Sequence, residues 1–241
     1  MDESFIPIYN YGGKVVGKKN TPTCEVIHGK KYNSKEGATI IAASKMKTDE
    51  KIPLAIVAKG KSKRCEKKFG VQKNDDEIIF HSPNGWTNSQ VMIKYLEWLS
   101  GKMDHQKFVL VLDVYKSHLK DEVLEKADEL GIHLIFVPAC GTGMYQPLDI
   151  SVFGVFKEKL RKYEKENKVP DEGTKRYSFF YQMIKDVWED INDSVFKKGW
   201  NIPGFNSDEY TSGESISDDE TTQDTDDSND LDFQDSSNEY E

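Results

Sequence analysis

Two uninterrupted apolar runs constrain the fold of this chain more than any other feature of its sequence. FVLVLDVY (residues 108–115) and IHLIFVP (132–138) consist almost entirely of Val, Ile, Leu and aromatic residues, which is typical of buried strands. The segment between them predicts a helix, with apolar side chains at helical spacing: Leu119, Val123, Ala127 and Leu130. Gly131 then suits the end of that helix, because glycine tolerates positive φ.

Shorter segments predict the remaining elements of the folded body. Strands are expected at residues 5–8, 38–44, 52–60 and 77–81, and helices at about 88–99, from Asp149 onward, and at 177–198 after an interruption at Pro170. Strands come first, then strands alternating with helices, then helices alone. This order indicates an α/β or α+β fold with a mixed sheet.

Charge divides the chain into two parts. Residues 207–241 contain 14 acidic side chains and no Lys or Arg, within a chain whose net charge is −9. The preceding 206 residues carry 28 acidic and 33 basic side chains, a net charge of +5 that is compatible with a polyanionic partner. We therefore expect a folded domain over residues 1–200 and a disordered acidic tail over 207–241.

Several classes of protein are disfavoured by composition. No apolar run approaches the roughly 18–20 residues that a transmembrane helix needs, so no membrane association is expected. The start of the chain does not resemble a secretory signal. Three widely spaced cysteines, Cys24, Cys65 and Cys140, form neither a disulfide framework nor a CxxC metal site and suit a reducing, intracellular compartment.

Three aspartates occur where an unpaired carboxylate is costly. Asp2 begins an apolar strand, Asp113 ends the most apolar strand, and Asp149 precedes an apolar helix. A carboxylate buried at such a position loses hydration unless a partner compensates, and Mg²⁺ prefers carboxylate oxygens. Taken one at a time, each aspartate is also explained as a turn cap.

The sequences around these aspartates resemble a known family. MDES, VLDVYKSH and YQPLDISVFGVFK match in order the three acidic blocks of the pogo/Tigger type of DDE transposases, and 35 residues separate Asp113 from Asp149. The intervening segments IPLAIVAKGKS and NGWTNSQVMIKYLEWL are similar as well. The resemblance covers about residues 1–200.

This resemblance implies an RNase H-like fold, a mixed five-stranded sheet flanked by helices. It also implies that Asp2, Asp113 and Asp149 are the catalytic residues and the ligands of Mg²⁺ or Mn²⁺, with two ions expected. The activity it implies is endonucleolytic cleavage of DNA and strand transfer, so DNA is the expected partner and the nucleus the expected location. A homo-oligomer is compatible with the sequence.

Other residues are candidates for supporting roles. His118 and Gln146 are candidates for contacts to a phosphate or to the aspartates, and both are also explained by structural roles. Glu3 should face away from Asp2 in a strand and at best act structurally or support the aspartates without contacting a ligand itself. Trp86 is interpreted as a core anchor rather than a base-stacking residue. A basic loop is a candidate for DNA-backbone contacts, the alternative being simple solvation: Lys59, Lys61, Lys63, Arg64, Lys67 and Lys68.

One departure from the family pattern leaves the activity open. The family places a helix-turn-helix region before the first acid, whereas here the first acid is residue 2. We therefore expect a domain truncated at its N-terminal edge, with sequence-independent DNA binding. The alternatives are a metal-dependent transposase domain, favoured by the three intact aspartates, and a host-adopted, non-catalytic nuclear protein, favoured by the truncation. An RNase H-type nuclease acting on RNA fits the blocks less well. The tail is expected to bind basic partners or its own body.

Overall fold

The structure, a computed structural model, describes residues 1–8, 36–46, 51–70, 78–167, 169–170 and 173–201. The described residues all belong to one compact unit, residues 1–206. The whole acidic tail lies outside the described residues, so its disorder stays a prediction.

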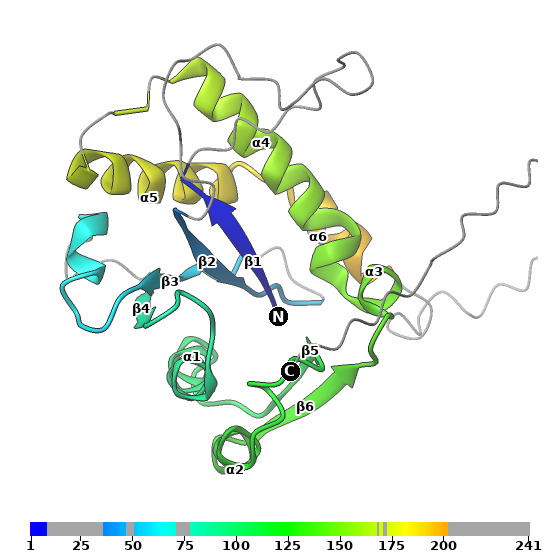
Figure 1. Ribbon diagram of the computed structural model, residues 1–241. Helices are drawn as coiled ribbons and strands as arrows, with labels where there is room; N and C mark the ends of the chain where they lie inside the picture. Colours follow the sequence, from blue (N-terminus) through cyan, green and yellow to red (C-terminus); the bar gives the residue numbers. More distant parts are fainter. Residues whose placement is uncertain (9–35, 47–50, 71–77, 168, 171–172, 202–241) are drawn as a thin grey trace, which may run out of the picture. The chain divides into compact units, whose positions relative to one another are not determined.

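Four strands form a mixed sheet, drawn in blue to green in Figure 1. Their order in the sheet is β1 (Asp2–Pro7), β2 (Gly37–Ala42), β3 (Ala55–Lys59) and β4 (Ile78–Ser82). The β1–β2 and β2–β3 pairs are antiparallel, and the β3–β4 pair is parallel. The sheet is therefore mixed, as expected.

The two apolar runs form a second, two-stranded sheet. β5 (Phe108–Asp113) and β6 (Ile132–Val137) pair in parallel, and α2 (Asp121–Glu129) connects them. The backbone nitrogen of Met1 donates a hydrogen bond to the carbonyl oxygen of Val111 (2.5 Å), which ties the start of β1 to β5. The N-terminus and β5 accordingly lie next to each other in Figure 1.

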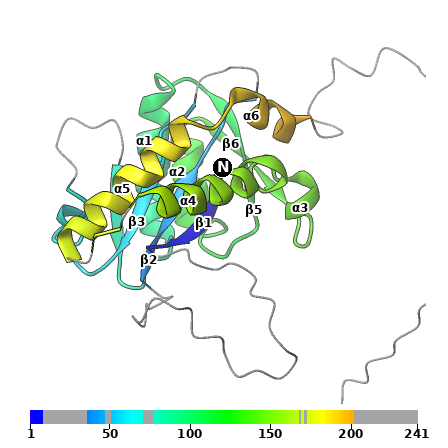
Figure 2. The same cartoon turned by 90° about the horizontal axis from the view of Figure 1, so that it is seen from above.

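Helices cover both faces of the strands (Figures 1 and 2). α1 (Ser89–Lys102) and α2 lie on one side, and α4 (Phe153–Glu166) and α5 (Gly173–Glu189) lie on the other. The shorter elements are η1 (a 3₁₀ helix, Glu66–Phe69), α3 (Thr142–Tyr145), η2 (a π-helix, Leu148–Val152) and α6 (Asp193–Trp200).

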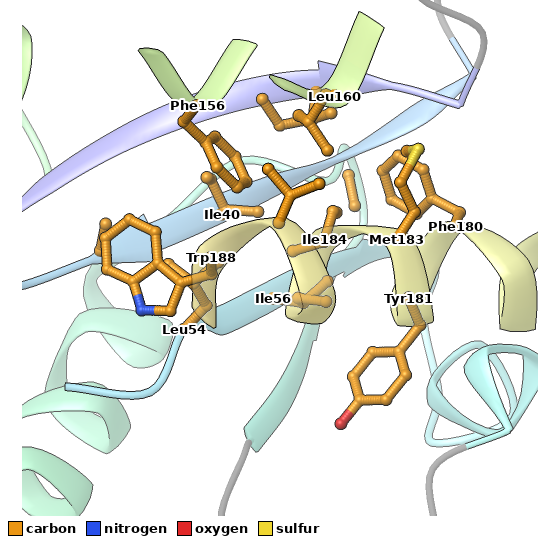
Figure 3. Close-up of a cluster of buried hydrophobic side chains, with 14 of the residues drawn as sticks. Ile40, Leu54, Ile56, Phe156, Leu160, Phe180, Tyr181, Met183, Ile184 and Trp188 are labelled. Atoms are coloured by element: carbon orange, nitrogen blue, oxygen red, sulfur yellow. The ribbon is translucent and has the colours of Figure 1, made fainter. Parts of the chain in front are cut away.

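Two hydrophobic cores result from the alternation of side chains along the strands. In β2, Ile40 points to α4 and α5 and Ile41 points to α1, and neither is accessible to solvent. Figure 3 shows the first core, in which Phe156 and Leu160 of α4 meet Ile184 of α5 over the sheet. Burial on both faces explains why β2 reads as a continuous apolar run.

The α/β class, with a mixed sheet flanked by helices, is confirmed. The strands differ from the implied single sheet of five, because the described residues form a four-stranded and a two-stranded sheet. The predicted helix over 177–198 is two helices. The side chain of Asn192 accepts a hydrogen bond from Ser194 N (2.9 Å) and caps α6, which ends the continuity. Leu119 precedes α2 and is 46% exposed, so it is not on the buried face.

Candidate active site

Asp2 is the most perturbed of the three aspartates. Its Oδ1 accepts a hydrogen bond from Glu3 N (2.7 Å). Its Oδ2 is buried and has no hydrogen-bond donor among the described residues. Burial, followed by the charge of Asp149, raises the pKa of Asp2 to about 7. The carboxyl group is therefore protonated in a large share of molecules at neutral pH.

Asp149 lies in η2, the π-helix that leads into α4. Such single π-turns are frequent at functional sites because they displace side chains from the regular helical face. Burial raises the pKa of Asp149, and the charge of Asp113 adds to this, while Lys157 and the adjacent Asp2 carboxyl oppose it. Two carboxyl groups in contact can share a hydrogen bond only when one is protonated, which agrees with the raised pKa of Asp2.

Asp113, at the end of β5, has the opposite electrostatic environment. The Nδ1 atom of His118 lies 3.0 Å from Asp113 Oδ1 and 3.1 Å from the Asp113 carbonyl oxygen. This hydrogen bond lowers the pKa of Asp113 despite partial burial. The charge of Asp113 also raises the pKa of both other aspartates, so the three carboxyl groups lie within electrostatic reach of one another.

His118 is held between two carboxylates. Its side chain is 1% exposed, and its Nε2 lies 3.4 Å from Glu3 Oε1. Burial alone would lower the pKa of His118, but the hydrogen bonds to Asp113 and Glu3 raise it to about 10. His118 is therefore a cation at neutral pH. Glu3 reaches it from the face of β1 opposite to Asp2, as the alternation of the strand predicts.

Gln146 joins the segment before Asp149 to β1. Its side chain is 1% exposed, and its Nε2 donates a hydrogen bond to the Met1 carbonyl oxygen (2.6 Å). This contact places the residue beside the backbone that carries Asp2. Gln146 therefore positions two chain segments relative to each other, and its hydrogen bond goes to backbone rather than to the Asp149 carboxyl.

The donor atoms of this site suit a hard divalent cation. All three predicted ligands are carboxylates, and burial and mutual repulsion leave two of them with raised pKa values. The described residues nevertheless contain no group of three or more His, Cys, Asp or Glu side chains arranged to hold a metal ion. The assignment as metal ligands stays a prediction.

The basic loop lies at the other end of the sheet. Its six cationic side chains are exposed: Lys59, Lys61, Lys63, Arg64, Lys67 and Lys68. Register places Val57 opposite Thr39 and hence level with Phe5, so Lys59 is level with Pro7. At about 3.3 Å per residue, this is about 17 Å along β1 from Asp2. A ligand that touches both the acids and the loop must extend along the sheet.

The prediction for Trp86 is wrong. The side chain is 50% exposed and stacks on Phe5 of β1 rather than entering a core. The turn between β4 and α1 crosses the end of the sheet and carries the indole outward. The apolar spacing of the sequence could not show this, because a tryptophan next to a helix start is compatible with either position.

Comparison with known proteins identifies the family. The family model described as "DDE superfamily endonuclease" matches residues 35–200, which is more than half of the chain. This chain is a member of the DDE superfamily endonucleases. The match contains Asp113 and Asp149 and begins after Asp2. The resemblance of the second and third acidic blocks to a DDE domain is thereby confirmed, whereas the block around Asp2 lies outside the matched residues.

Two individual proteins are similar to this DDE domain over different extents. The MFS-type transporter clz9 of Cochliobolus lunatus is 30% identical over 95 residues, which are 38% of this chain and 10% of that protein. A chain of the "Mos1 transposase paired-end complex with left transposon end" has 13% sequence identity and a TM-score of 0.42, covering 85% of this chain and 55% of that one. The DDE domain thus spans about a tenth and about half of these two proteins. Its described helices include none with the length and apolar character to cross a membrane.

Proposed function

We propose that this DDE domain cuts DNA and joins DNA strands with divalent metal ions, Mg²⁺ or Mn²⁺, held by Asp2, Asp113 and Asp149. The observation that carries the proposal is the Asp2 carboxyl on β1, whose Oδ2 is buried and lacks a donor among the described residues. Its charge and those of Asp113 on β5 and Asp149 in η2 influence one another. Burying a carboxyl oxygen without a donor costs free energy, and a bound cation would compensate for it.

The aspartates would hold two cations, which supply charge to stabilise the attacking and leaving oxygens of a phosphodiester. The residues of the chain keep this site assembled. Gln146 fixes the segment before Asp149 against β1, and η2 presents the Asp149 carboxyl beside that of Asp2. Loss of the proton from Asp2 is required before its carboxylate can bind a cation.

Asp113 would hold a cation through its second carboxylate oxygen, because the contact with His118 Nδ1 uses Oδ1. Glu3 holds His118 from the other side of the ring. The hydrogen bond from His118 lowers the pKa of the Asp113 carboxyl and so favours the ionised form that a cation requires.

DNA is the proposed substrate, and the nucleus the proposed location. The body of the chain has a net charge of +5, and the exposed loop over 59–68 concentrates six of its cations. Each Lys or Arg that contacts a phosphate releases counterions, so binding should weaken as the salt concentration rises. A homo-oligomer remains compatible with this proposal.

A plasmid-nicking assay tests the proposed function. Supercoiled DNA should be converted to open circles by the whole chain in Mg²⁺ or Mn²⁺ and should stay supercoiled in EDTA. Asp113→Asn and Asp149→Asn should each lower the rate by at least about 100-fold, because each removes one anionic ligand. Asp128→Asn, an exposed change on α2, is the matched control and should retain the wild-type rate.

The outcomes separate the candidate functions. Nicking that survives Asp149→Asn would show that the aspartates are not the catalytic centre. Absence of metal-dependent nicking, together with salt-sensitive DNA binding, would favour the non-catalytic alternative.

A further inference from the structure

Trp86 is an exposed aromatic residue that the proposed catalysis does not use. Half of its surface is accessible, and its ring stacks on that of Phe5, with ring centroids 6.1 Å apart and an interplanar angle of 28°. Exposed single apolar residues are common on protein surfaces and need no explanation. The rigidity and the surroundings of this one distinguish it.

The turn that carries Trp86 is fixed from several directions. Asn84 Oδ1 accepts a hydrogen bond from Trp86 N (3.1 Å), and Ser82 Oγ donates to the Trp86 carbonyl oxygen (2.7 Å). Thr39 Oγ1 on β2 donates to the Gly85 carbonyl oxygen (2.8 Å). The main chain of Trp86 is therefore held in one conformation before any ligand binds, which reduces the conformational entropy lost on binding.

The same turn lies against the start of the basic loop. Gly85 has φ = 82°, and a Cβ atom there would lie 3.1 Å from Lys59 Cβ, so the turn and the loop are in close contact. Glu66 is the single acid within residues 59–70, and it is engaged by His81 Nδ1. Among the described residues, no carboxylate pairs with Lys59, Lys61 or Lys63. These three lysines therefore have no acidic partner among the residues that the structure describes, and Lys59 lies beside the turn that carries the exposed Trp86.

We propose that Trp86, supported by Phe5, is a stacking site for an unpaired DNA base, with the neighbouring lysines binding the phosphates of that strand. Indole faces bind bases by stacking without regard to sequence, and lysines follow the backbone. A base inside a duplex presents no free face, so the site selects single-stranded or unpaired nucleotides. The inference rests on the DNA-binding part of the proposed function.

The position of Phe5 on β1 shows where the stacking site lies relative to Asp2. Phe5 is three residues from Asp2 along β1, about 10 Å at about 3.3 Å per residue. Along β1 the stacking site therefore lies between Asp2 and the level of the basic loop. Because side chains alternate along the strand, Phe5, like Glu3, faces away from Asp2, so the stacking site and the Asp2 carboxyl lie on opposite faces of β1.

Binding of labelled oligothymidine tests the site. Fluorescence anisotropy in EDTA, with the whole chain, measures affinity for the single strand and for a duplex of equal length without any catalysis. Trp86→Ala should weaken single-strand binding about 5- to 150-fold, because a stacked base contributes about 1–3 kcal/mol. Trp86→Phe should restore most of it. Leu124→Ala, which removes an exposed apolar side chain on α2, is the control and should change nothing.

Duplex binding separates stacking from a general structural effect. Trp86→Ala should alter duplex affinity less than about twofold, and an equal loss for both DNAs would overturn the proposal. So would unchanged single-strand affinity, or failure of the wild-type chain to bind the single strand. In those cases metal-dependent plasmid nicking by the wild-type chain would still support the proposed function.

A second measurement needs no variant. Irradiation of the wild-type chain with 5-iodouracil-containing oligonucleotide should crosslink DNA to the peptide containing Trp86, identified by mass spectrometry. Crosslinks found only at other aromatic residues would overturn the proposal, even if Trp86→Ala failed to fold.

Discussion

At the scale of single residues, three carboxyl groups of one type have different protonation equilibria. Burial and a neighbouring carboxylate raise the pKa of Asp2 and Asp149, whereas the hydrogen bond from His118 lowers that of Asp113. The proton on Asp2 therefore removes most of the repulsion between Asp2 and Asp149 at neutral pH. A bound cation would take the place of that proton, which couples cation affinity to the protonation of Asp2.

The charge of Asp2 should destabilise the metal-free protein at high pH. Its pKa of about 7 in the folded chain exceeds the value of 3.8 expected when unfolded, so stability falls as the pH rises between these values. Asp2→Asn removes the charge and should raise the free energy of unfolding by about 1–3 kcal/mol at about pH 8, while abolishing nicking. Urea denaturation in EDTA measures this difference.

The pH dependence provides the internal control for Asp2→Asn. Near pH 4 the wild-type carboxyl is largely protonated when folded, so the stability difference should shrink toward zero. Asp128→Asn should show no comparable pH dependence, since its side chain is exposed. A gain for Asp2→Asn that is equal at both pH values would contradict the buried-charge interpretation.

At the scale of elements, α6 holds the π-helix that carries Asp149. Ser151 Oγ in η2 donates a hydrogen bond to the Val195 carbonyl oxygen in α6 (2.7 Å). Gly199 lies so close to η2 that a Cβ atom would collide with the Pro147 carbonyl oxygen and with Ser151 Oγ. The segment that carries Asp149 can therefore take its position only because residue 199 of α6 has no side chain.

Gly199→Ala should therefore destabilise the protein, although alanine is the better helix former. A Cβ atom would lie 2.7 Å from Ser151 Oγ and even closer to backbone, so α6 and η2 must separate. We expect a loss of about 1–3 kcal/mol in the free energy of unfolding and a lower nicking rate. Chemical denaturation and the plasmid assay measure the two effects.

Gly154→Ala is the matched control for this change. Gly154 is exposed in α4, and no heavy atom outside its neighbourhood in the chain lies within 4 Å of an added Cβ. Alanine should stabilise the helix there by up to about 1 kcal/mol. If both variants were stabilised, the close approach of α6 to η2 would not be a constraint.

At the scale of the whole molecule, charge is segregated along the chain. The last 35 residues carry 14 acidic side chains, whereas the remainder has a net charge of +5. A tethered polyanion has a high effective concentration near its own body and repels DNA. Residues 1–206 are therefore positively charged, although the whole chain has a net charge of −9.

Deletion of residues 207–241 should tighten DNA binding. Removing 14 negative charges changes the net charge from −9 to +5, and the gain in affinity should shrink as salt screens the charges. Filter binding or anisotropy at low and high salt measures it. Unchanged affinity at low salt would leave the tail with a solubilising or partner-binding role.

The sequence by itself determined the local elements and the identity of the candidate site. Apolar runs correctly predict strands at β5 and β6, but the prediction that both strands are buried is wrong in part, because Val109 and Ile135 are 55% and 42% exposed. The three aspartates stand out because a carboxylate beside an apolar strand or helix needs a compensating partner. These signals come from short stretches of sequence, so they can be recognised without knowledge of the fold.

Tertiary structure decided which groups meet. Glu3 contacts His118 across 115 residues, and this contact together with Asp113 fixes the charge of the histidine. Trp86 is exposed because its turn crosses the end of the sheet onto Phe5. Such contacts depend on the register and pairing of strands, which place residues far apart in the sequence within a few ångströms. No periodicity or composition along the chain carries that information, because the energy of each contact arises only when the strands are assembled.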